Sequence, residues 1–142
     1  MKKVRELLAE KGTQVWSVAP TASVLDALNL MVEKNVGAVL VMDEDRLVGI
    51  ISERDHTRDV VLKSRTAKDT LVSDAMTPRP VCVRPDQTVD DCMALMTDKR
   101  VRHLPVLEED RVVGLISIGD VVKATISEQQ FVIAQLETYI SS

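Results

Sequence analysis

An internal repeat constrains this chain more than any other feature of its sequence. When the sequence is shifted by 65 positions, residues 16–58 align with residues 81–123 without a gap, and 17 of the 43 pairs are identical. Unrelated segments would share about three identities, so the chain is a tandem repeat. The match resumes upstream, where residues 4–8 align with residues 72–76 after three extra residues in the first copy. Because a unit of about 60 residues buries little surface alone, the copies are expected to pack together.

Each copy predicts the same order of secondary structure. A proline precedes each main helix, and Ser23 and Thr88 are suitable N-cap residues for these helices. Two apolar strands then flank a charged turn, a pattern typical of a β-hairpin. In the first copy the expected elements are a helical turn Val4–Leu8, an extended segment Val15–Val18, a helix from Val24, strands Val39–Met42 and Leu47–Ile51, and a helix from Ser52. Their counterparts are Val72–Met76, Val81–Val83, a helix from Val89, strands Leu104–Leu107 and Val112–Ile116, and a helix from Ser117.

The predicted fold class is α/β (α+β), with two tandem β-α-β-β-α repeats related by a pseudo-two-fold axis and their sheets packed together. Repeat 1 is expected over residues 1–62 and repeat 2 over residues 72–127. The segment 63–71 is polar and lacks an apolar period, so it is expected to be the linker. Residues 128–142 keep the helical spacing of apolar side chains and are expected to form a C-terminal helical extension that packs on a second subunit.

Charge and composition argue against several classes of function. The chain has 142 residues with 18 Lys or Arg and 22 Asp or Glu, and this net charge of −4 makes nucleic-acid binding through bulk charge unfavourable. One Trp, one Tyr and one Phe are too few for a platform that stacks single-stranded bases. The longest apolar runs fall far short of the roughly 20 residues of a membrane span, and the N-terminus is too polar for a signal peptide. We therefore expect a cytoplasmic protein that does not enter a membrane.

The two cysteines, Cys82 and Cys92, stand ten positions apart. This spacing matches neither a Cys-x-x-Cys redox pair nor a set of zinc ligands. We interpret both as small apolar residues in a reducing compartment, and we expect no metal site.

The copies share a Ser-x-x-Asp pattern after the last strand, at Ser52 and Asp55 and again at Ser117 and Asp120. A serine followed three residues later by an acid is typical of a capping box at a helix N-terminus. An ionised carboxylate is also a pure acceptor with two oxygens, which suits the two hydroxyls of a ribose. Both interpretations can hold together, because a cap uses one carboxylate oxygen and leaves the other free.

The copies differ where Arg102 and His103 enter a strand, because the first copy has Gly37 and Ala38 at these positions. Cations at a helix C-terminus would be the structural alternative, but these two residues are predicted to lie in the strand, on opposite faces. The asymmetry predicts that the charge of a phosphate group is met mainly by the second repeat.

The residues quoted so far, together with two pairs of longer motifs, carry a family resemblance. Val-Gly-Ala-Val-Leu-Val at 36–41 and Arg-His-Leu-Pro-Val-Leu at 102–107 precede Gly-Ile-Ile-Ser-Glu-Arg-Asp at 49–55 and Gly-Leu-Ile-Ser-Ile-Gly-Asp at 114–120. In order, spacing and duplication, nearly the whole chain resembles tandem CBS domains, a Bateman module. It is most similar to stand-alone bacterial CBS-pair proteins and to small plant CBS-pair proteins.

The resemblance implies a regulatory protein that binds an adenine nucleotide in clefts between the repeats. AMP is the expected ligand, with ADP, ATP or NAD(H) as variants, and no catalytic residue or catalytic cofactor is expected. Such a module would sense energy or redox state and signal by conformational change to an unknown protein target. The resemblance also implies a homodimer.

Two pseudo-symmetric clefts follow from the same resemblance. In the first, Ser52 and Asp55 would hold the ribose, Ile50, Pro80 and Val81 would surround the base, and Arg102 and His103 would face the phosphate. The second cleft would use Ser117, Asp120, Leu115, Val15, Trp16, Val36 and Gly37. From the final helices, Arg54 and Lys123 would reach a phosphate. Because Gly37 and Ala38 lack the basic pair, the second cleft is expected to bind phosphate weakly or to take a larger ligand such as NAD.

Two other classes of function stay open on the sequence. Ser117, Asp120 and His103 are the residue types of a hydrolytic triad, which would suit a nucleotide-processing enzyme. However, the chain has no Gly-x-Ser-x-Gly elbow, and nothing in the sequence places His103 against Ser117. A ligand-free dimerisation scaffold is the third interpretation. We favour the non-enzymatic regulatory module.

Overall fold

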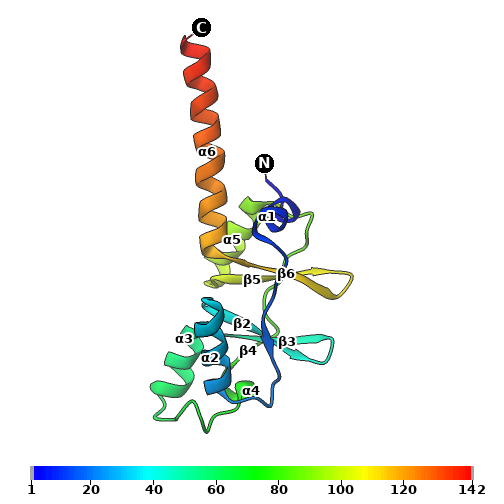
Figure 1. The fold of residues 1–142 in the computed structure, drawn as a ribbon, viewed down its shortest axis with the longest axis vertical. Coiled ribbons are helices and arrows are strands. Elements are labelled where there is room, and N and C mark those ends of the chain that lie inside the picture. Colours follow the sequence, from blue (N-terminus) through cyan, green and yellow to red (C-terminus); the bar gives the residue numbers. More distant parts are fainter. Residues whose placement is uncertain (1, 142) are drawn as a thin grey trace.

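The computed structural model describes residues 2–141, which form two stacked halves and a protruding C-terminal helix (Figure 1). Met1 and Ser142, the outer ends of the predicted repeat 1 and of the predicted extension, lie outside the described residues. The strands are β1 (Ser17–Val18), β2 (Ala38–Asp43), β3 (Arg46–Ser52), β4 (Thr77–Pro78), β5 (His103–Glu108) and β6 (Arg111–Ser117). The helices are α1 (Val4–Lys11), α2 (Val24–Lys34), α3 (Glu53–His56) with the π-helix η1 (Thr57–Val61), α4 (Val72–Ala75), α5 (Val89–Lys99) and α6 (Ile118–Ser141).

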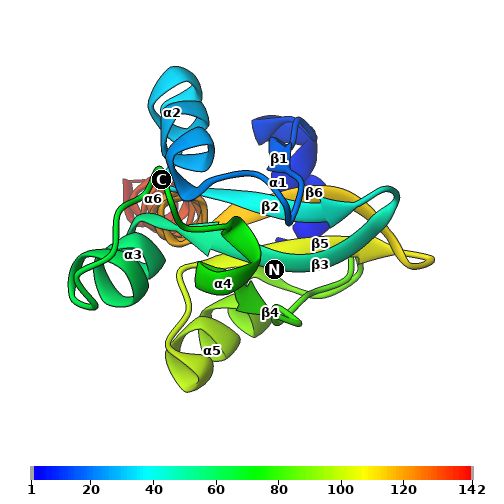
Figure 2. The same ribbon diagram turned by 90° about the horizontal axis from the view of Figure 1, so that it is seen from below.

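The predicted α+β class with two similar halves is confirmed. One half is built on a four-stranded sheet with the order β1-β2-β3-β4, and the other on the β5–β6 hairpin. The two hairpins have the same register, since Ala38 lies opposite Ser52 in the first and His103 lies opposite Ser117 in the second. The hairpins lie one above the other along the long axis of the molecule (Figures 1 and 2).

The main helices begin where the sequence predicts. The hydroxyl groups of Ser23 and Thr88 accept hydrogen bonds from the backbone N–H groups of Asp26 and Asp91, at 3.1 Å in each case. These bonds satisfy donors that the first turn of a helix leaves unpaired. Both helices therefore start at fixed points, which sets where the following strands enter the sheets.

The structure departs from the predicted elements in two places. Thr77 and Pro78 form a short strand, β4, which pairs with β3 and is the edge strand of the sheet in the first half. Two residues are too few to show a strand period, and a proline is tolerated only at an edge. The predicted linker is also not a free connection, because Thr70 is 5% exposed and its carbonyl accepts a hydrogen bond from the N–H of Val24.

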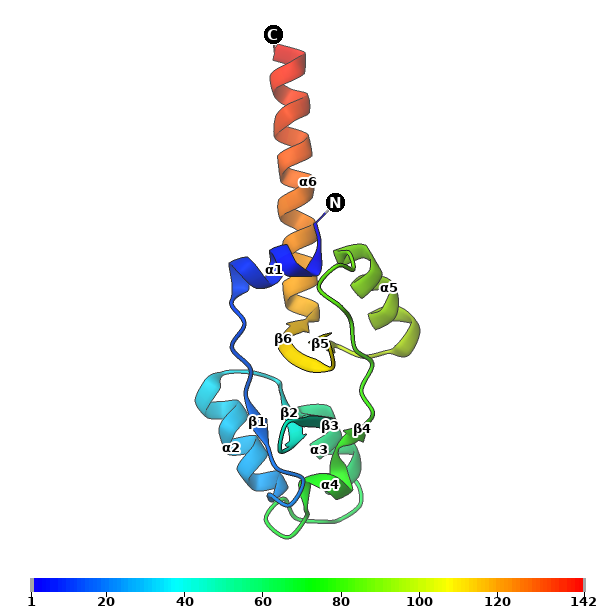
Figure 3. The ribbon, with the colours of Figure 1, turned by 90° about the vertical axis from the view of Figure 1, so that its right-hand side faces the viewer.

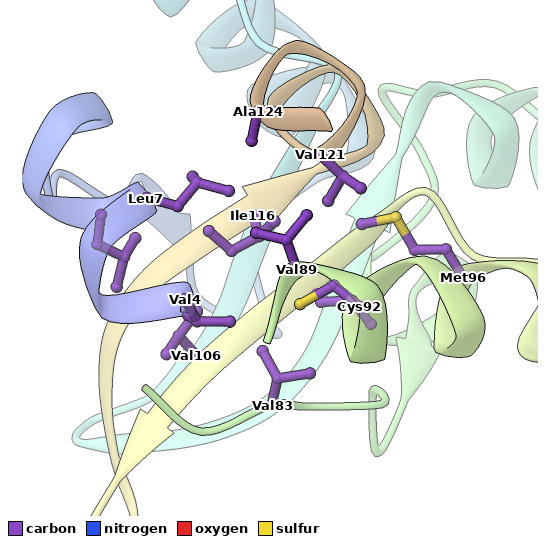
Figure 4. Close-up of a cluster of buried hydrophobic side chains, with 12 residues drawn as sticks. Val4, Leu7, Val83, Val89, Cys92, Met96, Val106, Ile116, Val121 and Ala124 are labelled. Atoms are coloured by element: carbon purple, nitrogen blue, oxygen red, sulfur yellow. The ribbon is translucent and has the colours of Figure 1, made fainter. Parts of the chain in front are cut away.

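Each sequence copy supplies one short helix to the hydrophobic core of the other half. Helix α1 contributes Val4 and Leu7 to the core of the second half, where they lie among side chains from α5, α6 and the β5–β6 hairpin (Figures 3 and 4). Helix α4 contributes Val72 and Ala75 to the core of the first half. The residues that pack together in each core therefore come from both sequence copies. Neither half is complete without a segment that the other copy supplies.

The exchanged segments cross the sheets at two equivalent glycines. A Cβ atom on Gly49 would lie 2.5 Å from the sulfur of Met76, and one on Gly114 would lie 2.6 Å from a methyl group of Leu8. Only a residue without a side chain permits this approach. This packing explains why glycine occurs at the same position of both copies.

Helix α6 continues well beyond the packed body of the second half (Figures 1 and 3). Val121 and Ala124 are buried, whereas every residue from 126 to 141 is exposed. The predicted helical extension is thus confirmed as a helix, and its packing on a second subunit stays a prediction. No helix within residues 2–141 has the length and hydropathy that crossing a bilayer requires.

We predict that Gly114→Ala lowers the free energy of unfolding by about 1–3 kcal/mol, because the new methyl group overlaps Leu8. Urea unfolding followed by circular dichroism measures this change. The matched control is Gly119→Ala, since the nearest atom to a Cβ there is the hydroxyl oxygen of Ser117 at 3.6 Å, an ordinary contact. Equal losses in the two variants would contradict the proposed close approach.

Candidate functional site

A cleft of about 440 Å³ lies between the two halves, where β3 ends and β5 begins. It brings together residues from four separate parts of the chain, namely 50–58, 77–81, 99–103 and Gly37. Every residue predicted for the first cleft lines it, and Arg54 does so as well: Ile50, Ser52, Arg54, Asp55, Pro80, Val81, Arg102 and His103. Their part in binding a ligand stays a prediction.

Helix ends position the side chains of this cleft. Strand β3 ends at Ser52, whose hydroxyl caps α3 and thereby holds Asp55 in the first turn of that helix. Helix α5 ends at Arg100, which adopts a left-handed conformation with φ 56° and redirects the chain toward β5. Because β5 begins only at His103, Arg102 lies in the bend before it, and both side chains face the cleft. The prediction that Arg102 lies in the strand is therefore wrong.

The cleft is cationic although the whole chain is anionic. Six basic side chains line it, against two carboxylates. Such a concentration of one sign of charge raises the local concentration of anions and favours a phosphorylated ligand. The basic residues are Arg54, Arg58, Arg79, Lys99, Arg100 and Arg102, and the acids are Glu53 and Asp55.

Gly37 lines this first cleft rather than the second one, to which it was assigned by position. A Cβ atom at residue 37 would lie 3.8 Å from Cε1 and from Nε2 of His103. The small residue of one copy therefore faces the large residue of the other. The loss of the basic pair in the first copy thus leaves space for the imidazole of the second.

Asp55 is nearly inaccessible, with 4% of its surface exposed, and it accepts four hydrogen bonds. Its Oδ2 accepts from the N–H of Ser52 at 2.8 Å and from the Ser52 hydroxyl at 3.1 Å. Its Oδ1 accepts from Nη2 of Arg58 at 2.7 Å and from the Thr77 hydroxyl at 3.1 Å. The capping-box interpretation is confirmed, but the expectation that the second oxygen stays free is wrong for Asp55. A ribose hydroxyl would have to replace Arg58 or Thr77.

His103 lies at the seam between the two halves, and its environment favours the neutral imidazole. Burial lowers the pKa of His103 from its usual 6.5, and the nearby positive charges of Lys11 and Arg102 lower it further. The carboxylates of Asp120 and Glu53 oppose this shift without reversing it. A dianionic phosphate placed beside His103 would have the opposite effect and would favour the imidazolium form.

The second Ser-x-x-Asp forms the same cap but has a different neighbour. The N–H of Ser117 donates to Oδ2 of Asp120 at 2.8 Å, and the N–H of Asp120 donates to the Ser117 hydroxyl at 3.2 Å. The ammonium group of Lys11 forms an ion pair with Oδ2 of Asp120 and donates to the carbonyl oxygen of Leu115 at 2.6 Å. These bonds from Lys11 and Ser117 hold the pKa of Asp120 below its usual value although burial opposes them.

The other residues predicted for the second cleft lie before β1, after α2 and on α6. Trp16 and Val36 pack against the core of the first half, and the ammonium group of Lys34 lies 4.3 Å from the centre of the Trp16 ring. Val15 is half-buried before β1. Lys123 is exposed on α6. The structure thus groups Ser117, Asp120 and Leu115 around Lys11. The part that the other residues play in a second cleft stays a prediction.

Sequence reasoning missed several residues that the structure places at these sites. Arg58 is the counterpart of Lys123 in the 65-residue register, so its position was available from the repeat. If the register of the upstream match is continued, with its three extra residues, Lys11 aligns with Arg79 and Ala9 with Thr77. That extension of the repeat is the signal that would have found them.

The residue types of the hydrolytic-triad alternative lie on the β5–β6 hairpin, with His103 and Ser117, and at the start of α6, with Asp120. The strand register does place His103 opposite Ser117, closer than the sequence indicated. However, among residues 2–141 no hydrogen bond joins His103 to Ser117, and the carboxylate of Asp120 is paired with Lys11. Within the same residues there is also no group of three His, Cys, Asp or Glu side chains that could hold a metal ion.

Comparison with known proteins assigns the family. The family model described as CBS domain matches residues 4–55 and 72–127. The chain belongs to the CBS-domain family. This CBS pair is 38% identical over 134 residues to the mitochondrial CBS domain-containing protein CBSX3 of Arabidopsis thaliana, a match that covers 91% of this chain. It spans 65% of the length of that relative.

Solved structures confirm the predicted resemblance to stand-alone CBS-pair proteins. A putative signal-transduction protein with CBS domains from Burkholderia ambifaria MC40-6 has 46% identity and a TM-score of 0.87, with 90% of this chain and 96% of that chain covered. The structure of CBSX2 in complex with AMP has 30% identity and a TM-score of 0.70, with 91% and 99% covered. The shared architecture therefore extends over almost the whole CBS pair.

We predict that the imidazole of His103 titrates below pH 6.5 in the free CBS pair, because burial and two nearby cations disfavour its charged form. The unfolded chain then binds more protons than the folded chain between the two pKa values. The free energy of unfolding should therefore fall as the pH decreases from 6.5 through the folded-state pKa. NMR titration of the His103 ring measures the midpoint, and His103→Gln should remove this part of the pH dependence. A midpoint above 6.5 would contradict the prediction.

Proposed function

We propose that this CBS pair is a regulatory module that binds an adenine nucleotide in the cleft between its halves. AMP is the principal ligand, with ADP, ATP and NAD(H) as variants. The main support for this proposal is the cleft of about 440 Å³. Residues from both repeats line it, and they include those predicted to contact the base, the ribose and the phosphate. That CBSX2 has been solved in complex with AMP supports this choice of ligand.

The chemistry of the lining assigns one part of the nucleotide to each part of the cleft. Ile50, Pro80 and Val81 give an apolar wall for the base. Arg102 and His103 are assigned to the phosphate, and Arg54 adds a further positive charge from α3. An arginine suits this role because its fork of N–H donors matches the oxygens of a phosphate.

The ribose is expected to bind by replacing Arg58 at Asp55. Arg58 has 62% of its side chain exposed, and its guanidinium also pairs with Asp59 at 2.9 Å. It can therefore leave Asp55 while keeping a carboxylate partner. The hydroxyls of a ribose would then donate to Oδ1 of Asp55, which keeps its cap bonds to Ser52 through Oδ2. No buried acceptor is left unsatisfied in either state.

Signalling follows from the position of the cleft between the halves. A nucleotide that contacts β3 of one half and the start of β5 of the other binds more tightly to the arrangement in which these parts lie close. Its binding shifts the population toward that arrangement by no more than its difference in affinity for the two. The rest of the surface presents this change to a protein target, and no chemical step is required.

We propose a cytoplasmic location from the state of the two cysteine thiols. Cys82 and Cys92 are both free, and burial raises the pKa of Cys92 to about 11 and also raises that of Cys82. Thiols held in this form act as small apolar side chains, which suits the reducing cytoplasm.

The ribose assignment is tested by calorimetric titration of AMP into the wild type and into Asp55→Asn. We predict that Asp55→Asn weakens binding by about 10–100-fold, because an amide has only one acceptor oxygen and cannot both keep the cap bonds to Ser52 and accept from the ribose hydroxyls with the other oxygen. The matched control is Asp59→Asn, which makes the same change at the other partner of Arg58 and lies outside the cleft. Equal affinity of all three proteins would contradict the ribose assignment. Absence of binding to the wild type would favour a ligand-free scaffold.

The phosphate assignment is tested in the same titrations with adenosine in place of AMP. The wild type is expected to bind AMP more tightly than adenosine, and Arg102→Ala is expected to reduce that preference by about 10-fold. Adenosine affinity itself should change little in the variant. Equal affinity of the wild type for AMP and adenosine would rule out a phosphate contact.

A homodimer through α6 is the proposed assembly. Val122, Ile126, Ile133 and Ile140 follow one face of this helix at spacings of four and seven residues, with 50%, 49%, 54% and 78% of each exposed. The buried Val121 and Ala124 face the body from the other side, so the exposed face points away from it. The helix of 24 residues is about 36 Å long, enough to pair along several turns.

The charged residues beside the apolar face of α6 favour an antiparallel arrangement of the two α6 helices in the dimer. Lys123 and Glu137 lie on the same flank of the apolar face, about four turns apart. In antiparallel pairs like flanks meet, so pairing centred near Gln130 places each Lys123 beside Glu137 of the second copy. A parallel pair would separate them.

We predict that the wild type sediments as a dimer at micromolar concentration and that Ile133→Lys raises its dissociation constant by about 10-fold or more, because the charge would be buried. Phe131→Lys is the matched control, since Phe131 is 65% exposed on the opposite face of the same helix. A wild type that sediments as a monomer, or equal weakening by both changes, would contradict pairing through this face.

A further inference from the structure

We propose that Lys11 occupies the second adenosine position, so that each chain binds one nucleotide. This inference rests on the proposed function and concerns its stoichiometry. It proposes that the last residue of α1 limits the number of nucleotides bound. Neither the sequence patterns nor the family resemblance singled out this residue.

The contacts of Lys11 coincide with those expected of an adenosine. Its ammonium group donates to the carbonyl oxygen of Leu115 at 2.6 Å and pairs with the carboxylate of Asp120. In the 65-residue register these residues correspond to Ile50 and Asp55, which lie beside the proposed base and ribose of the first cleft. One side chain of the protein therefore satisfies two groups that the second cleft would offer to a ligand.

Lys11 is held at this position by the exchange of helices between the cores. Val4, Leu7 and Leu8 of α1 are buried in the core of the second half, at 0%, 4% and 5% exposure. Lys11 follows them in the next turn, immediately before Gly12, whose φ of 101° ends the helix. The side chain thus projects from a fixed helix end toward Leu115 and Asp120.

The cation at the first cleft is more exposed than Lys11 and has a second carboxylate partner. Arg79, the counterpart of Lys11, lines that cleft, and the donors at Asp55 are Ser52, Arg58 and Thr77. Arg58 is 62% exposed and keeps Asp59 as a second partner when it leaves. The side chain of Lys11 is only 33% exposed, and its described ion pair is with Asp120.

Displacing Lys11 would carry a cost that displacing Arg58 does not. The carboxylate of Asp120 would exchange a charge-assisted bond for bonds to neutral hydroxyls, and the ammonium group would lose both of its acceptors. A neutral ribose compensates only part of this loss. The nucleotide therefore fills the first cleft and leaves the second to Lys11.

The test is the number of AMP molecules bound per chain, measured by calorimetry on the full chain. We expect one for the wild type, two for Lys11→Met, and one again for the double variant Lys11→Met with Asp120→Asn. Lys3→Met is the matched control, since Lys3 is exposed on the segment that precedes the same helix, and it should bind one. Thermal unfolding of each variant shows that it is folded, and Lys11→Gln provides a second neutral side chain of similar length.

The outcomes separate this inference from the proposed function. Two AMP molecules bound by the wild type, or one bound by both Lys11 variants, would overturn the role of Lys11 and leave the first cleft as a binding site. If the wild type binds none but Lys11→Met binds one that Asp120→Asn abolishes, the role of Lys11 is supported and the assignment of the first cleft fails. Absence of binding in every protein would overturn both.

Discussion

The exchange of short helices between the two repeats is the packing constraint on which the rest of the structure depends. Each repeat leaves an apolar sheet face that its own residues do not cover, and α1 and α4 complete the two cores crosswise. Burial of apolar surface is the main favourable term in folding, so the halves are stable only together. The exchange also requires glycine at residues 49 and 114, where the crossing segments approach the sheets. It fixes the seam in which the cleft lies.

Electrostatics at this seam differ from those of the chain as a whole. Helix ends and strand starts from both halves meet there. Of the six basic residues, Arg54, Arg58 and Lys99 lie on helical segments and Arg79, Arg100 and Arg102 lie on connections. A protein of net charge −4 thereby presents six basic side chains to one cleft. Because field strength depends on local arrangement, net charge excluded bulk binding of nucleic acid but carried no information about a small phosphorylated ligand.

The paired acids have the same structural role but different cationic partners. Asp55 and Asp120 both cap the helix that follows, and this use alone justifies the Ser-x-x-Asp pattern. What distinguishes them is the cation at each carboxylate. Arg58 reaches Asp55 from the same helical segment and is largely exposed, whereas Lys11 reaches Asp120 from the opposite end of the chain. Two copies of one motif thus have different capacities for a ligand.

The resemblance to CBS domains, rather than any local pattern, implied which residues meet in the first cleft. The sequence by itself determined the duplication, the order of elements, and the N-caps at Ser23 and Thr88. These depend on local periodicity, on capping chemistry within three residues, and on a repeat that relates equivalent positions. Only the tertiary structure decided that Oδ1 of Asp55 is already engaged, that Gly37 faces His103, and that Lys11 pairs with Asp120. Such contacts join segments as much as 109 residues apart, and their geometry follows from the crosswise packing of the cores, which no local pattern encodes.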